Sequence, residues 1–170
     1  VSVILENNIK IHNFYVPAGG DLPDMNLNEK FNHKISFIKE VFEFFNKQKI
    51  VNTVLVGDLN IAPYENDVWS HKQLLNVVSH TPIETELLKK LINDLNWVDV
   101  GRKYISKDEK LYSWWSYRNR DWKKSNRGRR LDHIWVSKDL DTILKSFSSC
   151  KEIRDWEKPS DHVPLITELS

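Results

Sequence analysis

The sequence predicts a mixed α/β domain in which strands alternate with helices along the chain. Two segments, residues 28–49 and 81–95, carry apolar residues at three- and four-residue steps, which is the spacing of one face of a helix. Short runs rich in β-branched residues alternate with them, and the run at residues 50–56 stops at a glycine, as a buried strand does. With 170 residues, of which 40% are hydrophobic, the chain is long enough to bury the core of one domain.

The chain opens with the pattern of a β-hairpin. Residues 1–5 are mostly apolar, residues 6–8 form a polar turn, and residues 9–15 resume the strand pattern. This opening lies inside a strand pattern and has no Met, so we expect a preceding segment to be missing. In residues 28–49 the side chains that share one helical face, and should pack against a sheet, are Phe31, Ile35, Ile38, Val41, Phe42 and Phe45.

A buried strand, a second helix and two further strands follow. Residues 50–56 form the strand. Thr81, Pro82 and Glu84 are the start signal of the helix, because Thr caps, Pro fits the first turn and Glu reaches back to the cap. Residues 131–137 and 162–169 predict the last two strands, and no internal repeat or low-complexity tract interrupts the pattern.

Composition limits the classes of function and of metal site. A single cysteine, Cys150, excludes a disulfide framework and a cysteine-based zinc site, so a metal would need carboxylate, amide and imidazole ligands. No apolar run approaches the ~18 residues of a membrane span, and no basic, apolar leader opens the chain. We therefore expect a cytoplasmic protein with no membrane partner.

The net charge of +1 hides a strongly basic segment. Residues 101–131 contain 11 basic and 3 acidic residues, interleaved with tyrosines and tryptophans. Cations meet phosphates while flat side chains stack on bases, so this pattern is typical of a nucleic-acid surface. A solvated loop with a few core aromatic residues would give the same composition.

Three short motifs at the ends of predicted strands carry the chemistry. Asp58 and Asn60 follow the buried strand, where an Asp can take a proton from water and an Asn can hold that water or a phosphate oxygen. The same Asp-x-Asn pattern is also ordinary turn chemistry. Tyr15 ends the first hairpin, where a core tyrosine is the simpler interpretation.

The remaining motif combines Asp132 with Asp161 and His162. A histidine oriented by a carboxylate acts as a general acid or binds phosphate, and a further carboxylate beside it suits Mg²⁺. An Asp that caps a helix and a His bonded to the backbone are the structural alternatives. Pro159 and Pro164 restrict the loop around this motif.

The order of these motifs along the chain is more specific than any one of them. They are Tyr15-x-Pro17-x-Gly19, Gly57-Asp58-Leu59-Asn60, Tyr112-Ser113-Trp114-Trp115-x-Tyr117-Arg118, Gly128-Arg129-Arg130-Leu131-Asp132 and Lys158-Pro159-Ser160-Asp161-His162-x-Pro164. In this order they resemble the exonuclease III family of apurinic/apyrimidinic (AP) DNA endonucleases. That family lies in the endonuclease/exonuclease/phosphatase superfamily with deoxyribonuclease I, whose fold is a sandwich of two β-sheets flanked by helices.

The resemblance implies a role for each matching residue. Asp58 would activate the attacking water, Asn60 would hold that water or the phosphate, and Tyr15 would lie near the phosphate. Asp132 would orient the catalytic His162. The metal ligands implied are Asp161, Asp58, Asn60 and His162. Trp114 and Trp115 would line a pocket for the abasic sugar, with Arg118 and Arg129 on the DNA-binding surface.

The family resemblance also implies a reaction and its partners. The reaction is hydrolysis of the phosphodiester 5′ to an abasic site in double-stranded DNA, with 3′–5′ exonuclease and 3′-phosphatase activities alongside it. The cofactor would be Mg²⁺, or Mn²⁺ in its place, and the enzyme would be a cytoplasmic monomer associated with the bacterial nucleoid.

One departure from the family pattern concerns the front of the domain. The family carries an early Asn and a metal-binding Glu before the hairpin that opens this sequence. We therefore expect residues 1–170 to be the C-terminal portion of a single domain, without its N-terminal strands, and the metal site to be incomplete. Two alternatives stay open. One is another phosphodiesterase of the superfamily, acting on a lipid or a small substrate. The other is a DNA-binding fragment without catalysis.

Overall fold

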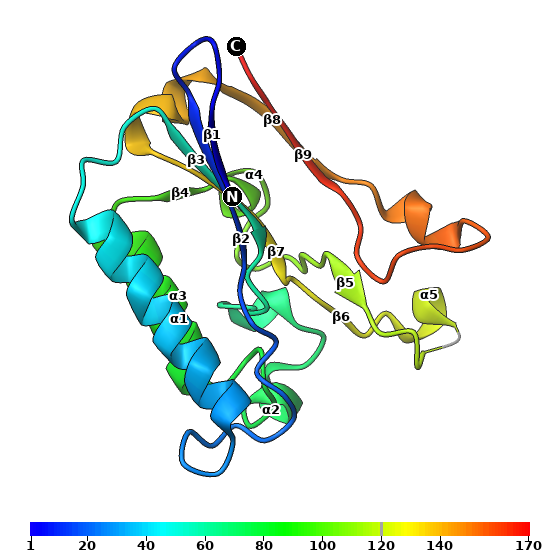
Figure 1. Cartoon of the computed structure of the whole chain (residues 1–170). Helices are drawn as coiled ribbons and strands as arrows, with labels where there is room; N and C mark the ends of the chain where they lie inside the picture. The colour runs from blue at the N-terminus through cyan, green and yellow to red at the C-terminus, as the bar shows by residue number, and fades with distance from the viewer. Residues whose placement is uncertain (120) are drawn as a thin grey trace.

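A computed structural model describes residues 1–119 and 121–170 and contains three β-sheets with helices around them (Figure 1). The largest sheet has the strand order β1 (Ser2–Ile4), β2 (Lys10–Tyr15), β3 (Thr53–Asp58), β7 (Asp132–Val136) and β4 (Val98–Asp99). Two-stranded sheets pair β5 (Trp114–Trp115) with β6 (Gly128–Arg129), and β8 (Leu144–Ser149) with β9 (Leu165–Leu169). The helices are α1 (Glu29–Asn46), α2 (His71–Leu74), α3 (Pro82–Asp94), α4 (Val100–Tyr104) and α5 (Trp122–Ser125). The predicted mixed α/β class is confirmed.

The middle of the large sheet brings three strand ends together. β2 and β3 run parallel, and the long helix α1 lies between them in the chain. β7 runs antiparallel to β3. Parallel neighbours end at the same edge of a sheet, and an antiparallel neighbour begins there. The last residues of β2 and β3 therefore meet the first residue of β7.

Helices α1 and α3 lie side by side against one face of the large sheet, as their apolar faces predicted (Figure 1). Asn28 caps α1 by accepting from the N–H groups of Lys30 and Phe31. Thr81 and Glu84 form the predicted capping box of α3. The core between these helices and the sheet includes Ile38, Val41, Phe45, Leu55, Leu88, Leu91 and Trp135. Each such side chain contributes about 1.5–3 kcal/mol on burial, so this core fixes the helices against the sheet.

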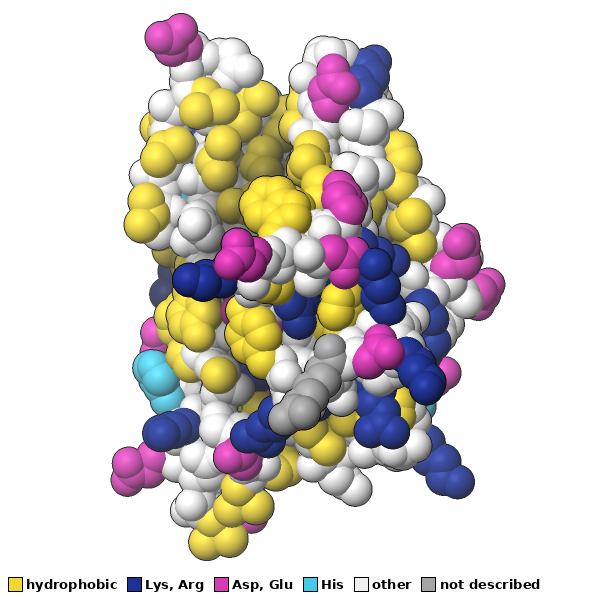
Figure 2. Space-filling view, turned by 90° about the vertical axis from the view of Figure 1, so that its right-hand side faces the viewer, with side chains coloured by type: hydrophobic (Ala, Val, Ile, Leu, Met, Phe, Trp, Pro, Cys, Tyr) yellow, Lys and Arg dark blue, Asp and Glu magenta, His cyan; other side chains and the backbone are white. Residues whose placement is uncertain are grey.

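The β8–β9 sheet packs on the opposite side of the large sheet. The apolar cluster between them includes Val54, Ile134, Val136, Leu144, Leu165 and Leu169. Two facing sheets, with α1 and α3 on the outer face of the large sheet, confirm the predicted architecture. Some apolar side chains remain exposed on the outer strands, among them Ile4 at 67% and Ile166 at 51%. Figure 2 shows hydrophobic side chains over the upper part of one face, and Lys and Arg gathered mainly in its lower half.

Among the residues that the structure describes, no helix is both long enough and apolar enough to cross a bilayer.

Two strands begin later than their sequence patterns predicted. β3 starts at Thr53 and runs to Asp58, and Asn52 before it has a left-handed backbone with φ of +49°. β9 starts at Leu165 and not at His162, because Pro164 has no N–H to donate to a strand ladder. His162 instead forms an isolated bridge with Trp114.

Candidate active site

The register of three strands aligns Tyr15, Asp58 and Asp132, which form the first row of site residues. Tyr15 on β2 pairs with Asp58 on β3, and Asp58 pairs with Asp132 on β7. Residues directly opposite one another on neighbouring strands lie close together on the same face. The sheet thus brings a phenol and two carboxylates, distant in the sequence, to one edge.

Gly57 permits the close approach of β2 and β3 at this edge. Its φ is +137°, and a Cβ atom built on it would lie 1.9 Å from the carbonyl oxygen of Phe14. No other residue fits such a contact without moving a strand. The glycine before Asp58 is therefore a structural requirement of the motif.

A second row of residues is centred on Trp114. Trp114 pairs with Arg129 in the β5–β6 ladder and with His162 in the isolated bridge. Its indole Nε1 donates to Oδ2 of Asp161 at 2.9 Å. Trp114 is therefore flanked by a residue with a guanidinium group on one side and one with an imidazole on the other.

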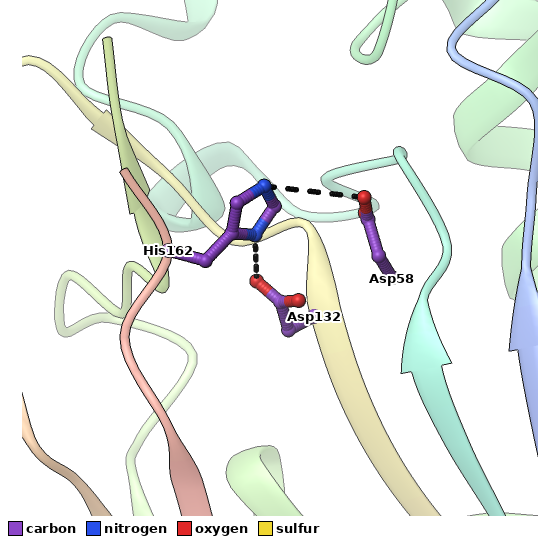
Figure 3. A group of neighbouring side chains, drawn as sticks. All are labelled: Asp58, Asp132 and His162. Atoms are coloured by element: carbon purple, nitrogen blue, oxygen red, sulfur yellow. Dashed lines mark hydrogen bonds and ion pairs between the residues drawn. The ribbon is translucent and has the colours of Figure 1, made fainter. Parts of the chain in front are cut away.

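His162 lies between the carboxylates of Asp58 and Asp132, as Figure 3 shows. Its Nδ1 lies 2.8 Å from Oδ2 of Asp132, and its Nε2 lies 4.0 Å from Oδ2 of Asp58. An ionised carboxylate can only accept, so Nδ1 carries the proton of the first contact. Asp132 therefore holds the ring with Nε2 toward Asp58. One oxygen atom of a water or a phosphate can lie within hydrogen-bond distance of both groups.

Asn60 fixes the carboxylate of Asp58. The backbone N–H of Asn60 donates to Oδ1 of Asp58 at 2.9 Å, and its Nδ2 donates to Oδ2 at 3.1 Å. Nδ2 also donates to the carbonyl of Val16 at 2.9 Å, and the φ of Asn60 is +51°. The turn interpretation of this motif is thus correct, and it is compatible with catalysis, because the same bonds orient the carboxylate.

The surroundings of Asp58 and His162 shift the pKa values of both groups. Burial, followed by the negative charge of Asp132, raises the pKa of Asp58 to about 6. Burial acts to lower the pKa of His162, but the hydrogen bond to Asp132 and the charges of Asp132 and Asp58 raise it overall. The pair therefore combines a carboxylate that accepts a proton with an imidazolium that can donate one.

The chain's own side chains fit a divalent cation. Asp58, Asp132 and His162 each offer a ligand atom, and these atoms lie within 4.8 Å of one another. Carboxylate oxygens are the ligands that Mg²⁺ and similar hard cations prefer. The structure does not bring the predicted ligand Asp161 into this group, because its carboxylate is bonded to the Trp114 indole.

The residues of the two rows, apart from Asp132, line a cleft of about 690 Å³. Of the predicted substrate contacts, Trp114, Arg118 and Arg129 all line it. Tyr15 lines it too and is 67% exposed, so it is not the core tyrosine of the simpler interpretation. The cleft thus combines the reacting groups with a flat aromatic wall and cations.

Trp115 does not line this cleft, so the prediction that both tryptophans form the sugar pocket is wrong for Trp115. It is 1% exposed and packs in an apolar cluster with Tyr112 and Val163. Its Nε1 donates to Oδ1 of Asn126 at 3.2 Å. Successive side chains on a strand point to opposite faces, so Trp114 faces the cleft while Trp115 enters the core.

The sequence interpretation missed the support beneath the site. Lys34 on α1 is fully buried, forms an ion pair with Glu84 at 2.5 Å, and donates to the carbonyl of Asn60 at 2.8 Å. The signal was present, because Lys34 lies on the apolar face of the helix, three residues after Phe31 and four before Ile38. A lysine on that face needs a buried partner.

Comparisons with known proteins identify the family of this chain. Residues 35–162 match the model of the endonuclease/exonuclease/phosphatase family. Exodeoxyribonuclease III of Haemophilus influenzae is 30% identical over 169 residues, which are 95% of this chain and 61% of that protein.

Solved structures give the same result. An AP endonuclease from Archaeoglobus fulgidus matches with a TM-score of 0.87 and 30% identity, over 95% of this chain and 62% of that one. A 3′ phosphatase from Neisseria, bound to product DNA hairpin, matches with a TM-score of 0.88 and 26% identity, over 99% and 63%. The chain spans about three fifths of the length of these relatives. The resemblance inferred from the motifs is confirmed, and the chain belongs to the endonuclease/exonuclease/phosphatase family, with exodeoxyribonuclease III and AP endonucleases as homologues.

Proposed function

We propose that this chain carries the catalytic residues of a DNA-repair nuclease, acting as the C-terminal portion of its catalytic domain. The reaction is Mg²⁺-dependent hydrolysis of the phosphodiester 5′ to an abasic site in double-stranded DNA. Removal of 3′-terminal nucleotides and of 3′-phosphates uses the same attack by water, on a substrate bound in a different position. The observation that carries this proposal is the Asp132–His162 pair facing Asp58 on a cleft lined with cations.

Asp58 acts as the general base in this mechanism. Its raised pKa, about 6, suits a carboxylate that must take a proton from water near neutral pH. The two hydrogen bonds from Asn60 hold the carboxylate oxygens in place, so the water is aligned without further reorganisation. The attack proceeds in line with the bond from phosphorus to the leaving 3′ oxygen.

His162 neutralises negative charge as that bond breaks. Its raised pKa favours the imidazolium, and Asp132 holds the ring so that Nε2 points to the reacting atoms. A divalent cation bound at Asp58 and its neighbours would add positive charge beside the phosphoryl oxygens. Tyr15, which is exposed at the end of β2 and lines the cleft, donates a hydrogen bond from its hydroxyl group to a phosphate oxygen in this mechanism.

The test uses the full-length protein and a duplex that contains one abasic site. Asp58→Asn and His162→Ala should each lower the cleavage rate by several orders of magnitude. When catalytic residues act as a unit, removing any one of them removes most of the rate enhancement. Affinity for the duplex should survive in both variants, since the arginines that line the cleft are unchanged.

Asp94→Asn provides the matched control for the charge change. Asp94 ends α3, is exposed and lies outside the cleft, so this variant should cleave like the wild type. Wild-type cleavage by Asp58→Asn would contradict the assignment of the general base. Hydrolysis of a lipid phosphodiester without cleavage of DNA would favour the other branch of the superfamily.

A further inference from the structure

Two consecutive arginines have opposite surroundings. Arg130 is buried, and its guanidinium bonds to Oδ2 of Asp67 at 3.0 Å and to both carboxylate oxygens of Asp99 at 2.8 Å. Arg129 lines the cleft, and within the described residues no carboxylate lies within ion-pair distance of it. One arginine is therefore neutralised inside the protein, while its neighbour presents an uncompensated charge to the cleft.

The guanidinium of Arg129 keeps free hydrogen-bond donors. Its Nη1 donates to Oγ of Ser79 at 2.7 Å and to the carbonyl of Val78 at 3.1 Å, and both of these acceptors are neutral. Burial without a contacting counter-ion lowers the pKa of Arg129, against a more distant attraction to Glu84. The N–H groups on Nε and Nη2 remain for a ligand. A partly buried cation with neutral partners binds an anion more readily than a paired one.

The orientation of this guanidinium is fixed from the core. Ser79, which accepts from Arg129, has a φ of +88° and donates its N–H to both oxygens of Glu84, at 3.0 and 2.9 Å. Glu84 is in turn paired with the buried Lys34. The ring of Trp114 lies 5.5 Å from Cζ of Arg129 and restricts its other side. The donors are thus held in one direction before any ligand arrives.

The strand register places Arg129 within reach of the reaction centre. Arg129 pairs with Trp114, and Trp114 pairs with His162, so all three side chains project from one face. Neighbouring strands lie about 4.8 Å apart, so the Cα atoms of Arg129 and His162 are separated by about 10 Å. Both side chains line the same cleft, on either side of Trp114.

We propose that Arg129 is a specificity-determining residue that recognises a phosphate group at the 3′ end of a DNA strand. This inference rests on the proposed nuclease function and selects among its substrates. A terminal phosphate carries about 1.5 to 2 negative charges at pH 7, and a phosphodiester inside the strand carries about one. A fixed cation without a counter-ion favours the more highly charged group. Removal of a 3′-phosphate therefore depends on Arg129 more than incision at an abasic site does.

A binding experiment tests this without turnover. Full-length wild type and Arg129→Gln are mixed, in EDTA, with fluorescent DNA hairpins that end in a 3′-phosphate or a 3′-hydroxyl. The wild type should prefer the phosphorylated hairpin by about 10- to 100-fold, the usual effect of a hydrogen bond to a charged group. Arg129→Gln should lose most of this preference. The wild-type ratio of affinities in the variant would overturn the proposal.

Arg118→Gln is the matched control, because Arg118 lines the same cleft but is exposed. It should weaken binding of both hairpins equally and leave their ratio unchanged. Arg129→Lys keeps the positive charge but loses the planar guanidinium with its paired donors. Its ratio of hairpin affinities should fall between those of the wild type and Arg129→Gln. If Arg129→Gln unfolds, the lysine variant decides, and a wild-type ratio in it overturns the proposal.

Rates of turnover distinguish a failure of this inference from a failure of the proposed function. In the wild type, the rate of 3′-phosphate removal is compared with the rate of abasic-site incision, both with Mg²⁺. Arg129→Gln should lower the first at least about 10-fold more than the second. A wild type that cleaves neither substrate would contradict the proposed function, while the ratio of hairpin affinities would still decide the role of Arg129. Equal losses on both substrates would make Arg129 a general DNA contact and overturn the inference.

Discussion

Two adjacent tryptophans on β5 differ in what they contact. Trp114 is half-buried, lines the cleft and lies against the guanidinium of Arg129. Trp115 is buried, and its ring lies 5.2 Å from that of Trp122. The same substitution at these two positions therefore tests two different properties, recognition of DNA and stability of the fold.

Trp114→Ala should reduce the preference for abasic over intact duplex more than it reduces overall DNA affinity. A flat apolar wall accepts a sugar that has lost its base and crowds one that retains it. Trp115→Ala should instead cost about 3–5 kcal/mol of unfolding free energy, through the cavity it leaves. Urea unfolding and fluorescence anisotropy with both duplexes distinguish the two. A folded Trp114→Ala with unchanged preference would contradict the pocket.

His133 shows how burial makes a residue sensitive to pH. It is 2% exposed, and its Nε2 lies 2.8 Å from the carbonyl of Ile61, to which it donates as a neutral ring. Burial, followed by the positive charge of Arg130, lowers the pKa of His133 to about 4. Between this value and the ordinary value near 6.5, only the unfolded chain is protonated at this residue.

Acidification should therefore unfold the wild type more readily than His133→Gln, which can still donate to Ile61. The unfolded state binds more protons in this interval, so stability rises with pH and is lost as pH falls from about 6.5 to 4. The difference in unfolding free energy between the two proteins should shift by roughly 3 kcal/mol across it. Urea titrations at pH 7 and pH 4.5 measure the shift, and a pH-independent difference would refute it.

At the scale of elements, local patterns predicted some parts of the fold and not others. Helices α1 and α3 were predictable because apolar spacing and caps are properties of the local sequence. Strands β5 and β6 were not, since each has two residues and exists only because the two segments meet. The outward position of Trp114 and the buried one of Trp115 follow from that pairing. The sequence motifs therefore predicted that Trp114 lines the cleft, but not that Trp115 is buried.

The ion pair between α1 and α3 shows the same dependence on tertiary contacts. Lys34 and Glu84 are both fully buried. The Lys34 ammonium also donates to the carbonyls of Asn60 and Ala18, at 2.8 and 3.2 Å. Glu84 also accepts from the N–H of Thr81 at 3.1 Å. The pair thus ties two helices to the loop that follows Asp58.

Lys34→Met should destabilise the fold by about 3–5 kcal/mol, because it leaves the carboxylate of Glu84 buried without a cation. The double variant Lys34→Met/Glu84→Gln should lose less than the sum of the single variants, since the neutral amide no longer needs that partner. Chemical denaturation of the wild type, the two single variants Lys34→Met and Glu84→Gln, and the double variant measures the interaction energy of the pair. Strict additivity would show that the two side chains do not interact.

At the scale of the whole molecule, the basic segment divides into structural and free cations. Arg102 and Arg130 are paired inside the protein, and Lys103 and Lys123 form ion pairs with Asp141 and Asp155, at 2.5 and 2.6 Å. Arg118, Arg127 and Arg129 line the cleft. Arg120 lies outside the described residues. The sequence predicted the excess of positive charge, but its partition depends on partners from distant parts of the chain.

This partition predicts how the proposed DNA binding depends on salt. Each cation that neutralises a phosphate contributes about −0.9 to the slope of log affinity against log salt. Arg118 and Arg127, the cleft arginines other than Arg129, predict a slope of about −2 for the full-length protein on an abasic duplex, whereas contacts from all 11 basic residues of the segment would give about −10.

Arg118→Gln should therefore flatten the slope by about 0.9, because Arg118 is exposed in the cleft and free to meet a phosphate. Lys123→Gln is the matched control, since Lys123 is paired with Asp155, and its slope should equal that of the wild type. Both are measured by titrating an abasic duplex between 50 and 300 mM salt. Equal flattening by the two substitutions would mean that the duplex separates Lys123 from Asp155 and binds well beyond the cleft.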